Sequence, residues 1–337
     1  MSTSSRLPVR FWIGISVSVV FLVLAFRKVE WPEVFAAWSG ARPAWMAVGV
    51  VMLVGAWLVA AVRWKVILAP APQVSVRDTF SFISIGYLAN TILPLRLGDL
   101  ARATLIGRQR HLGISRALGS MALERVMDLL TLVLFIFALA LVMEIPKIVQ
   151  AGIATMAIGA VVMLVGLIVL SLHRKKIVHL HRVLCWILPE RFASRICTLP
   201  ERFTQGLDVI KHPTRLFAVL LLSVGVWLLA GLATYIWLLA FNLNLPMWAG
   251  LFVLVVINLG SAIPSSPGYV GVYHFLAVLS LSAWNVERNP ALAYAIGTHA
   301  LNILANVVVG GFFLAKEGIS LKALSHADES VEKVEND

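Results

Sequence analysis

Apolar positions along this chain form long unbroken runs, not the alternation of a half-buried strand. A helix needs roughly 20 apolar residues to cross the hydrocarbon layer of a membrane. Six runs reach or approach that length. The pattern therefore predicts six membrane-spanning helices, at 11–26, 43–62, 117–143, 148–172, 215–241 and 290–315.

The first run is short and follows two basic residues, Arg6 and Arg10. That arrangement is typical of a secretory signal peptide. No small-residue cleavage site follows directly, and the next residues include Arg27 and Glu30. We therefore interpret the run at 11–26 as a retained membrane anchor, with a cleaved signal peptide as the alternative.

Two further apolar stretches are interrupted by proline. Residues 79–95 end at Pro94, and residues 247–284 contain Pro264 and Pro267. Proline lacks the amide hydrogen that a continuing helix donates, and its ring clashes with the previous turn. Broken backbone at membrane depth is tolerated only inside protein or beside a water-filled cavity. We expect re-entrant hairpins or discontinuous helices here; loops at the membrane surface are the alternative.

These two interrupted stretches resemble each other at an offset of 170 residues. Segment 90–98 aligns with segment 260–268, and in each a proline is followed four positions later by a glycine, Gly98 or Gly268. If the stretches enter from opposite faces, the chain is an inverted repeat. In transporters of that architecture the broken helices meet near the midplane and form the binding site. Their free N–H groups suit an anionic group such as phosphate.

Composition and charge narrow the class of protein. Hydrophobic residues make up 60% of the 337 residues and charged residues 13%, which excludes an ordinary soluble domain. The net charge of +11 could indicate nucleic-acid binding. With the N-terminus placed in the cytoplasm, 22 of the 28 Lys and Arg fall in inside segments such as 63–116, five fall outside, and Arg125 lies within a span. This asymmetry predicts a multi-pass protein of a bacterial-type cytoplasmic membrane, both termini cytoplasmic, and no nucleic-acid partner.

The domain organisation follows from the same pattern. We predict one membrane domain over 1–326, with halves at about 11–172 and 215–320. The basic, partly apolar segment 173–214 is predicted to be a cytoplasmic linker that lies on anionic lipid. The acidic tail at 327–337 is predicted to be disordered. No residue pattern indicates a metal site or a cofactor.

Several charges lie where hydrocarbon is expected. Glu124, Arg125 and Asp128 fall within the span at 117–143, and such charges usually face a partner or a cavity. Glu124 and Asp128 share one helix face, and Arg125 can reach Asp128. Asp99 and Arg102 can pair in the same way. These residues form either an ion-pair cluster that fixes helix packing or the polar wall of a headgroup pathway.

The second half offers histidines instead. His299 occupies roughly the position in its half that Arg125 occupies in the first, after the offset is shifted by four. A neutral histidine can donate to phosphate or relay a proton, and the simpler alternative is a hydrogen bond to a nearby carbonyl. The predicted headgroup-binding residues are Asn90, Arg96, Asp99, Arg102, Glu124, Arg125, Asp128, Tyr273, His274 and His299.

The motifs themselves resemble a known family. Asn90-x-x-x-Pro94-x-Arg96-x-Gly98-Asp99-x-x-Arg102, followed by Glu124-Arg125-x-x-Asp128, is similar to the membrane region of lysylphosphatidylglycerol synthases, the flippase-like domain family. The second signature is Pro264-Ser265-Ser266-Pro267-Gly268-Tyr269-x-Gly271-x-Tyr273-His274. The resemblance covers about residues 10 to 320. Here Asp99 replaces a glutamate, and His274 and His299 stand where many members have Glu and Arg, so the headgroup is left open.

The resemblance implies a polytopic all-α bundle with re-entrant segments that moves a lipid between leaflets. We therefore expect a lipid translocator for a polar, anionic or modified headgroup, and no enzyme, since neither a G-x-S-x-G nor an H-E-x-x-H motif is present. The alternative is an enzyme, or a membrane component, of lipid-linked glycosyl or aminoacyl transfer. A lipid-synthesis enzyme is then the expected protein partner.

Overall fold

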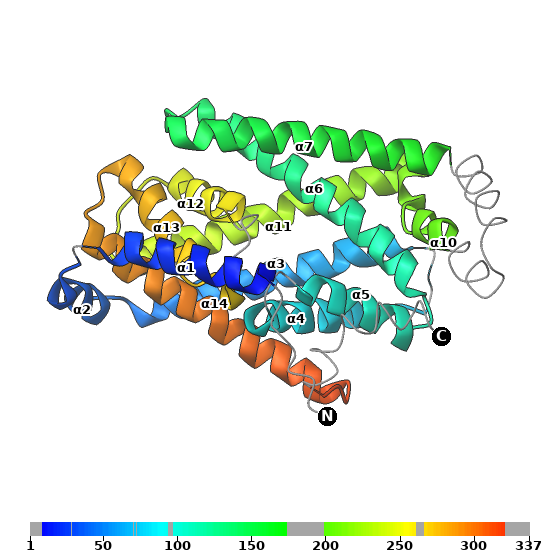
Figure 1. Cartoon of the computed structure of the whole chain (residues 1–337), viewed down its shortest axis with the longest axis horizontal. Coiled ribbons are helices and arrows are strands. Elements are labelled where there is room, and N and C mark those ends of the chain that lie inside the picture. The colour runs from blue at the N-terminus through cyan, green and yellow to red at the C-terminus, as the bar shows by residue number, and fades with distance from the viewer. Residues whose placement is uncertain are drawn as a thin grey trace.

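A computed structural model describes residues 9–27, 29–69, 71, 73–93, 97–173, 199–260 and 266–320. Pro94, Arg96, Pro264, most of the basic linker and the acidic tail lie outside these residues. Within them the chain is helical, without strands (Figure 1). The α-helices are α1 Val9–Phe26, α2 Trp31–Ser39, α3 Pro43–Leu68, α4 Val76–Ile92, α5 Leu97–Gln109, α6 Ile114–Ala140, α7 Lys147–Leu172, α10 Leu199–Gln205, α11 Pro213–Ala240, α12 Met247–Gly260, α13 Val272–Leu281 and α14 Arg288–Lys316. Short 3-10 turns are η1 Asp208–Lys211, η2 Pro267–Tyr269 and η3 Ser282–Trp284.

All six segments predicted to span the membrane lie in helices. Four helical segments of the described chain are long and apolar enough to cross a membrane: α3, α11, α14 and Ala154–Leu172 of α7. Helix α6 is equally long but carries charges at Glu124, Arg125 and Asp128, and α1 is a shorter apolar helix. The protein is thus an all-α membrane protein, and the number of full spans stays a prediction.

The two interrupted stretches are each a helix, a break and a second helix. In the first, α4 ends at Ile92 and α5 begins at Leu97. In the second, α12 ends at Gly260, the turn η2 follows, and α13 begins at Val272. Both breaks fall where the prolines predicted them.

The order of helices repeats along the chain. Helices α11, α12, α13 and α14 begin 170, 171, 175 and 174 residues after α3, α4, α5 and α6, respectively. Contacts repeat as well: α4 packs on α14 as α12 packs on α6, and α3 packs on α14 as α11 packs on α6. The shift of four that aligns Arg125 with His299 is therefore the true offset between α6 and α14.

The equivalent helices α3 and α11 pack against each other at the centre of the bundle, between α7 along one edge and α14 along the other (Figure 1). They run antiparallel, because the start of α3 lies beside the end of α11: the indole of Trp237 donates to the Met46 carbonyl at 3.1 Å. At the opposite ends, Arg63 donates to Ser223 at 3.0 Å. Two equivalent helices that pack antiparallel are related by a two-fold axis across their length. The repeat is therefore inverted.

The described end of the basic linker joins the bundle. Helix α10 packs on α6 where two glycines meet the opposing backbone: a Cβ at Gly119 would lie 2.1 Å from the Phe203 carbonyl, and one at Gly206 would lie 2.3 Å from the Arg116 carbonyl. This part of 173–214 is fixed by protein contact. The predicted lipid-surface helix falls on residues 174–198, outside the described residues.

A polar cluster joins the ends of three helices. Arg110, at the end of α5, donates to Asp78 at the start of α4 at 2.8 Å and to Glu317 after α14 at 3.2 Å. Asp78 also forms a capping box with Ser75. Burial alone would raise the pKa of Asp78, but the hydrogen bonds from Arg110 and Ser75 hold that pKa below its ordinary value.

The close approach of α3 and α11 gives the first prediction. A Cβ on Gly49 would lie 2.2 Å from the Trp237 indole nitrogen, whereas a Cβ on Gly55 in the same helix meets nothing within 4 Å. We expect Gly49→Ala to lower stability by about 1–3 kcal/mol, the usual cost of overpacking. Gly55→Ala is the matched control. Thermal unfolding in detergent measures both, and equal melting temperatures would contradict the packing described.

The Asp78 cluster gives a prediction about pH. Because the pKa of Asp78 is lower in the folded protein, its stabilisation is complete above the ordinary carboxyl pKa and is lost as the pH falls through the lowered value. Asp78→Asn should remove that acid-sensitive part. Melting temperatures across an acid series should therefore fall less steeply for Asp78→Asn than for the wild type. Asp208→Asn, which removes a more exposed pair with Lys211, is the control.

Candidate functional site

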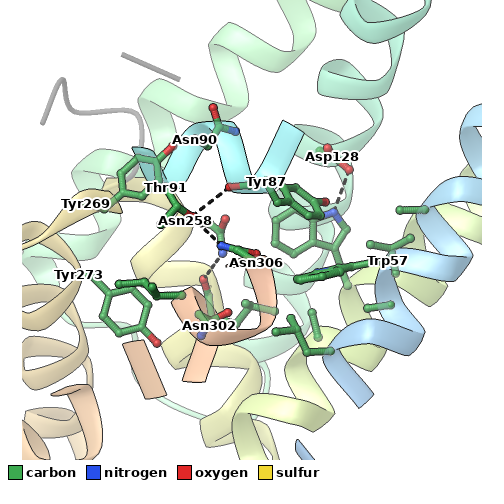
Figure 2. A pocket seen from close by; sticks show the side chains of 18 of the residues that line it. Trp57, Tyr87, Asn90, Thr91, Asp128, Asn258, Tyr269, Tyr273, Asn302 and Asn306 are labelled. Atoms are coloured by element: carbon green, nitrogen blue, oxygen red, sulfur yellow. Dashed lines mark hydrogen bonds between the residues drawn. The ribbon is translucent and has the colours of Figure 1, made fainter. Parts of the chain in front are cut away.

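A cavity of about 290 Å³ lies between the two halves, beside both helix breaks (Figure 2). This size is at the lower end of the ~300–1,000 Å³ of small-molecule sites. Helices α3, α4, α6, α11, α12 and α14 and the turn η2 all contribute to the wall. The polar and aromatic lining is Trp57, Arg63, Tyr87, Asn90, Thr91, Glu124, Arg125, Asp128, Trp227, Asn258, Tyr269, Tyr273, His299, Asn302 and Asn306.

The first break is closed by a side chain of the helix that precedes it. The side-chain oxygen of Asn90 accepts the amide hydrogen of Gly98 at 2.9 Å. Helix α5 then turns back tightly on α4, so that a Cβ on Gly98 would lie 2.1 Å from the Gly86 carbonyl. Only glycine fits at position 98, and Asn90 is held at the cavity wall.

The second break is held by the two histidines. The backbone is left-handed at Gly268 and Gly271, with φ of +67° and +91°. His299 Nε2 bonds the Gly268 carbonyl at 2.7 Å and must carry the proton, because a carbonyl only accepts. His274 Nδ1 accepts the amide hydrogen of Gly271 at 3.3 Å. These are bonds to neighbouring backbone, the simpler of the two alternatives for histidine.

The two breaks meet in space. A Cβ on Gly268 would lie 3.5 Å from the Thr91 carbonyl, and Asn306 of α14 donates to the Thr91 hydroxyl at 3.0 Å. On the other side of η2, the Tyr273 ring stacks on His299 with ring centres 4.6 Å apart. His274 packs edge-on against His299 at 4.9 Å. The sequence motifs of both halves therefore lie around one cavity.

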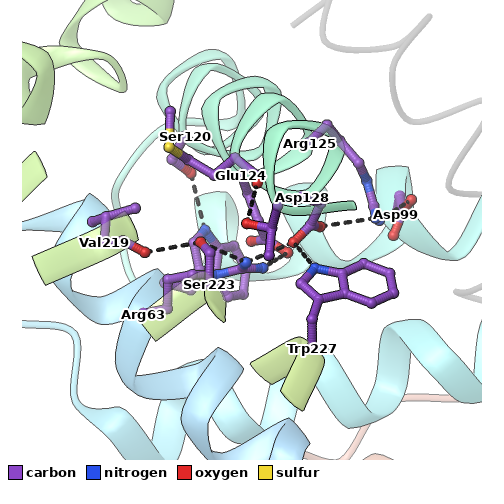
Figure 3. Close-up of polar contacts among 12 residues, drawn as sticks. Arg63, Asp99, Ser120, Glu124, Arg125, Asp128, Val219, Ser223 and Trp227 are labelled. Carbon is purple, nitrogen blue, oxygen red and sulfur yellow. Dashed lines mark hydrogen bonds and ion pairs between the residues drawn. The ribbon is translucent and has the colours of Figure 1, made fainter. Parts of the chain in front are cut away.

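Below the cavity, six charged side chains form a closed ring of alternating sign, which we call the charge ring (Figure 3). Arg63 comes from α3, two residues come from α5 and three from α6. Going round, the N···O distances are Asp99–Arg102 3.8 Å, Arg102–Glu124 2.9 Å, Glu124–Arg63 3.3 Å, Arg63–Asp128 2.6 Å, Asp128–Arg125 3.6 Å and Arg125–Asp99 2.5 Å. Each residue therefore has two partners of opposite charge.

The charge ring is bonded to the second half as well. Trp227 of α11 donates its indole hydrogen to Asp128 at 3.0 Å, and Ser223 accepts from Arg63. The guanidinium of Arg102 also lies over the Trp64 ring, 4.8 Å from its centre. Charges this deep in the bundle are tolerated because every one is paired and hydrogen-bonded.

Most of the predicted residues converge on this site. Asn90, Glu124, Arg125, Asp128, Tyr273 and His299 line the cavity. Asp99 and Arg102 lie in the charge ring, and both of the i,i+3 pairs predicted from the sequence form. His274 packs on His299 without lining the cavity. Arg96, Pro94 and Pro264 lie outside the described residues.

Arg63 is the main correction. The sequence pattern ended its helix at residue 62 and counted Arg63 as a cytoplasmic loop charge. In the structure α3 continues to Leu68, and the Arg63 side chain is 2% exposed and bonded to Glu124 and Asp128. The error has a physical cause, because the partners that make burial tolerable come from a helix about 60 residues away in sequence.

The sequence also missed the amides and aromatic rings of the wall. Trp57, Tyr87, Asn258 and Asn306 line the cavity but are unexceptional singly in apolar helices. One signal was present: Asn302 and Asn306 are four apart on α14 and therefore share a face.

The charge ring gives a prediction about stability. Arg63→Met removes the partner that Glu124 and Asp128 share, and breaking a buried pair in this way costs about 3–5 kcal/mol. We expect a large loss of folded protein or of melting temperature. Lys211→Met, which breaks an exposed pair with Asp208, should cost at most about 1 kcal/mol. Equal effects in size-exclusion and thermal-unfolding assays would show that the ring contributes little.

Comparison with known proteins agrees with this arrangement. A family model described as the lysylphosphatidylglycerol synthase TM region matches residues 11–310. Glycosyltransferase AglD of Haloferax volcanii is 24% identical over 91% of this chain and 54% of its own length, so the chain spans about half of that relative. UPF0104 membrane protein MJ1078 of Methanocaldococcus jannaschii is 28% identical over 68% of this chain and 95% of its own length. No solved structure matches. The chain belongs to the family of lysylphosphatidylglycerol synthase transmembrane regions.

Proposed function

We propose that this protein translocates a membrane lipid, or a lipid-linked substrate, between leaflets. The observation that carries the proposal is the cavity between the two inverted halves, at the point where both helix breaks meet. Backbone that leaves the helical conformation at this depth needs protein or water around it, and a cavity for a polar group supplies both. In inverted-repeat transporters this is the position of the substrate site.

A second cavity supports a path across the bundle. It has a volume of about 200 Å³ and shares Tyr269, Tyr273 and Asn302 with the first. The first cavity reaches Arg63, near the end of α3, and the second reaches Trp237, near the end of α11. Because α3 and α11 are antiparallel, those residues lie towards opposite ends of the helix pair. A headgroup could thus pass along the interface of the halves while its acyl chains stay in lipid.

The orientation belongs to the same proposal. We place both termini in the cytoplasm of a cell with a bacterial-type cytoplasmic membrane, so that the charge ring faces the inner leaflet. Movement is then downhill or coupled to an ion.

The competing function is an enzyme, or a membrane component, of lipid-linked sugar or aminoacyl transfer. It is favoured by the printed name of one relative, a glycosyltransferase, although this chain spans 54% of that relative. A translocator and a transferase differ in what they leave behind: only a transferase changes the covalent structure of the lipid.

Reconstitution tests the proposal. Liposomes carrying the purified protein and fluorescent lipids should exchange lipid between leaflets faster than empty liposomes, with every lipid recovered chemically unchanged. Arg125→Gln, which opens the charge ring at the cavity wall, should lower exchange at least fivefold for all lipids while the protein stays monodisperse. Lys211→Gln should match the wild type. Exchange no faster than in empty liposomes across neutral, anionic and cationic lipids would reject translocation.

A further inference from the structure

The charge ring bears on the kind of headgroup that the cavity takes. Around the described part of the cavity, the three arginines of the ring balance its three carboxylates, and each guanidinium already has two carboxylate partners. Arg125 has the most accessible side chain of the three, 37% exposed, and it is bonded to Asp99 and Asp128. A phosphate must therefore displace a carboxylate from an arginine, and an ammonium group must displace an arginine from a carboxylate. Both exchanges cost a buried ion pair.

The rest of the polar wall consists of neutral amides. Asn302 donates its amide hydrogen to the Thr298 carbonyl at 2.8 Å, and Asn306 donates to the Thr91 hydroxyl at 3.0 Å. With the nitrogen of each held by protein, the amide oxygen is the atom left to accept a hydrogen bond from a ligand. Both residues line the cavity on the same face of α14 (Figure 2). Acceptors of this kind suit a ligand that carries hydroxyl groups.

Aromatic rings complete the wall. Trp57 packs at 5.1 Å from the Tyr87 ring on one side of the cavity, and Tyr269 and Tyr273 line the other (Figure 2). An aromatic face offers a flat apolar surface, whereas the amides offer hydrogen bonds at the edge of the ligand. A sugar ring has both features, with C–H groups on its faces and hydroxyls around its rim.

Resting on the proposed translocation, we infer that the cavity recognises an uncharged, hydroxyl-rich headgroup of the size of a single sugar ring. The volume of about 290 Å³ admits one small polar group and not an oligosaccharide. The amides of Asn302 and Asn306 select the headgroup, and the charge ring holds the wall in place without binding the ligand. This departs from the anionic headgroup that the sequence led us to expect.

A lipid panel tests the inference. Wild-type protein in liposomes is assayed with fluorescent monoglucosyl diacylglycerol, phosphatidylglycerol, lysylphosphatidylglycerol and phosphatidylethanolamine. We expect the glucosyl lipid to exchange at least tenfold faster than the anionic and cationic lipids. Phosphatidylglycerol or lysylphosphatidylglycerol moving as fast as the glucosyl lipid would overturn the inference and leave translocation standing. If no lipid moves, the proposed function fails first, and the inference with it.

Two variants test the residues. Asn302→Leu and Asn306→Leu keep the approximate volume of the side chain and remove the acceptor. Each should lower exchange of the glucosyl lipid at least fivefold and leave that of phosphatidylethanolamine unchanged, which a merely misfolded protein would not do. Asn244→Leu, an exposed asparagine after α11, is the matched control and should behave as the wild type. An equal loss for every lipid would assign the two amides a structural role and overturn their part in selection.

Discussion

Six paired charges of alternating sign control how the centre of this bundle is built. In a low-dielectric interior an unpaired charge is costly, so Arg63, Arg102 and Glu124 can be buried only while their partners are in place. Because the six residues come from α3, α5 and α6, closing the ring fixes how those helices pack. Hydrogen bonds from α11 to the same ring extend the constraint to the second half. The polar side of the cavity depends on this arrangement.

Inverted symmetry explains why the cavity lies where it does. The central pair α3 and α11 packs antiparallel, and each half brings one broken helix to the centre. At the first break an asparagine satisfies the free backbone, and at the second the two histidines do so. The halves have thus diverged in chemistry while keeping one architecture, with a charge ring in the first and neutral rings in the second.

Much of the fold and part of the site could be predicted from the sequence. The apolar runs located the long helices, and the prolines located both breaks, because hydropathy and the missing proline amide act locally. The pairs Asp99–Arg102 and Arg125–Asp128 also followed from helix spacing. Arg63 and the wall of amides and aromatic rings did not, because their meaning lies in contacts between helices far apart in sequence. Neither helical periodicity nor composition carries that information.

The sequence by itself determined that this is a membrane protein, where its helices break and which of its charges are costly. Those properties depend on local composition and on backbone chemistry. Only the tertiary structure decided what the charges do. It paired Glu124 and Asp128 with Arg63, closed a ring without net charge, and placed asparagines and aromatic rings along the remaining wall. The reason is that electrostatic free energy depends on distance and burial, which are set when the helices pack.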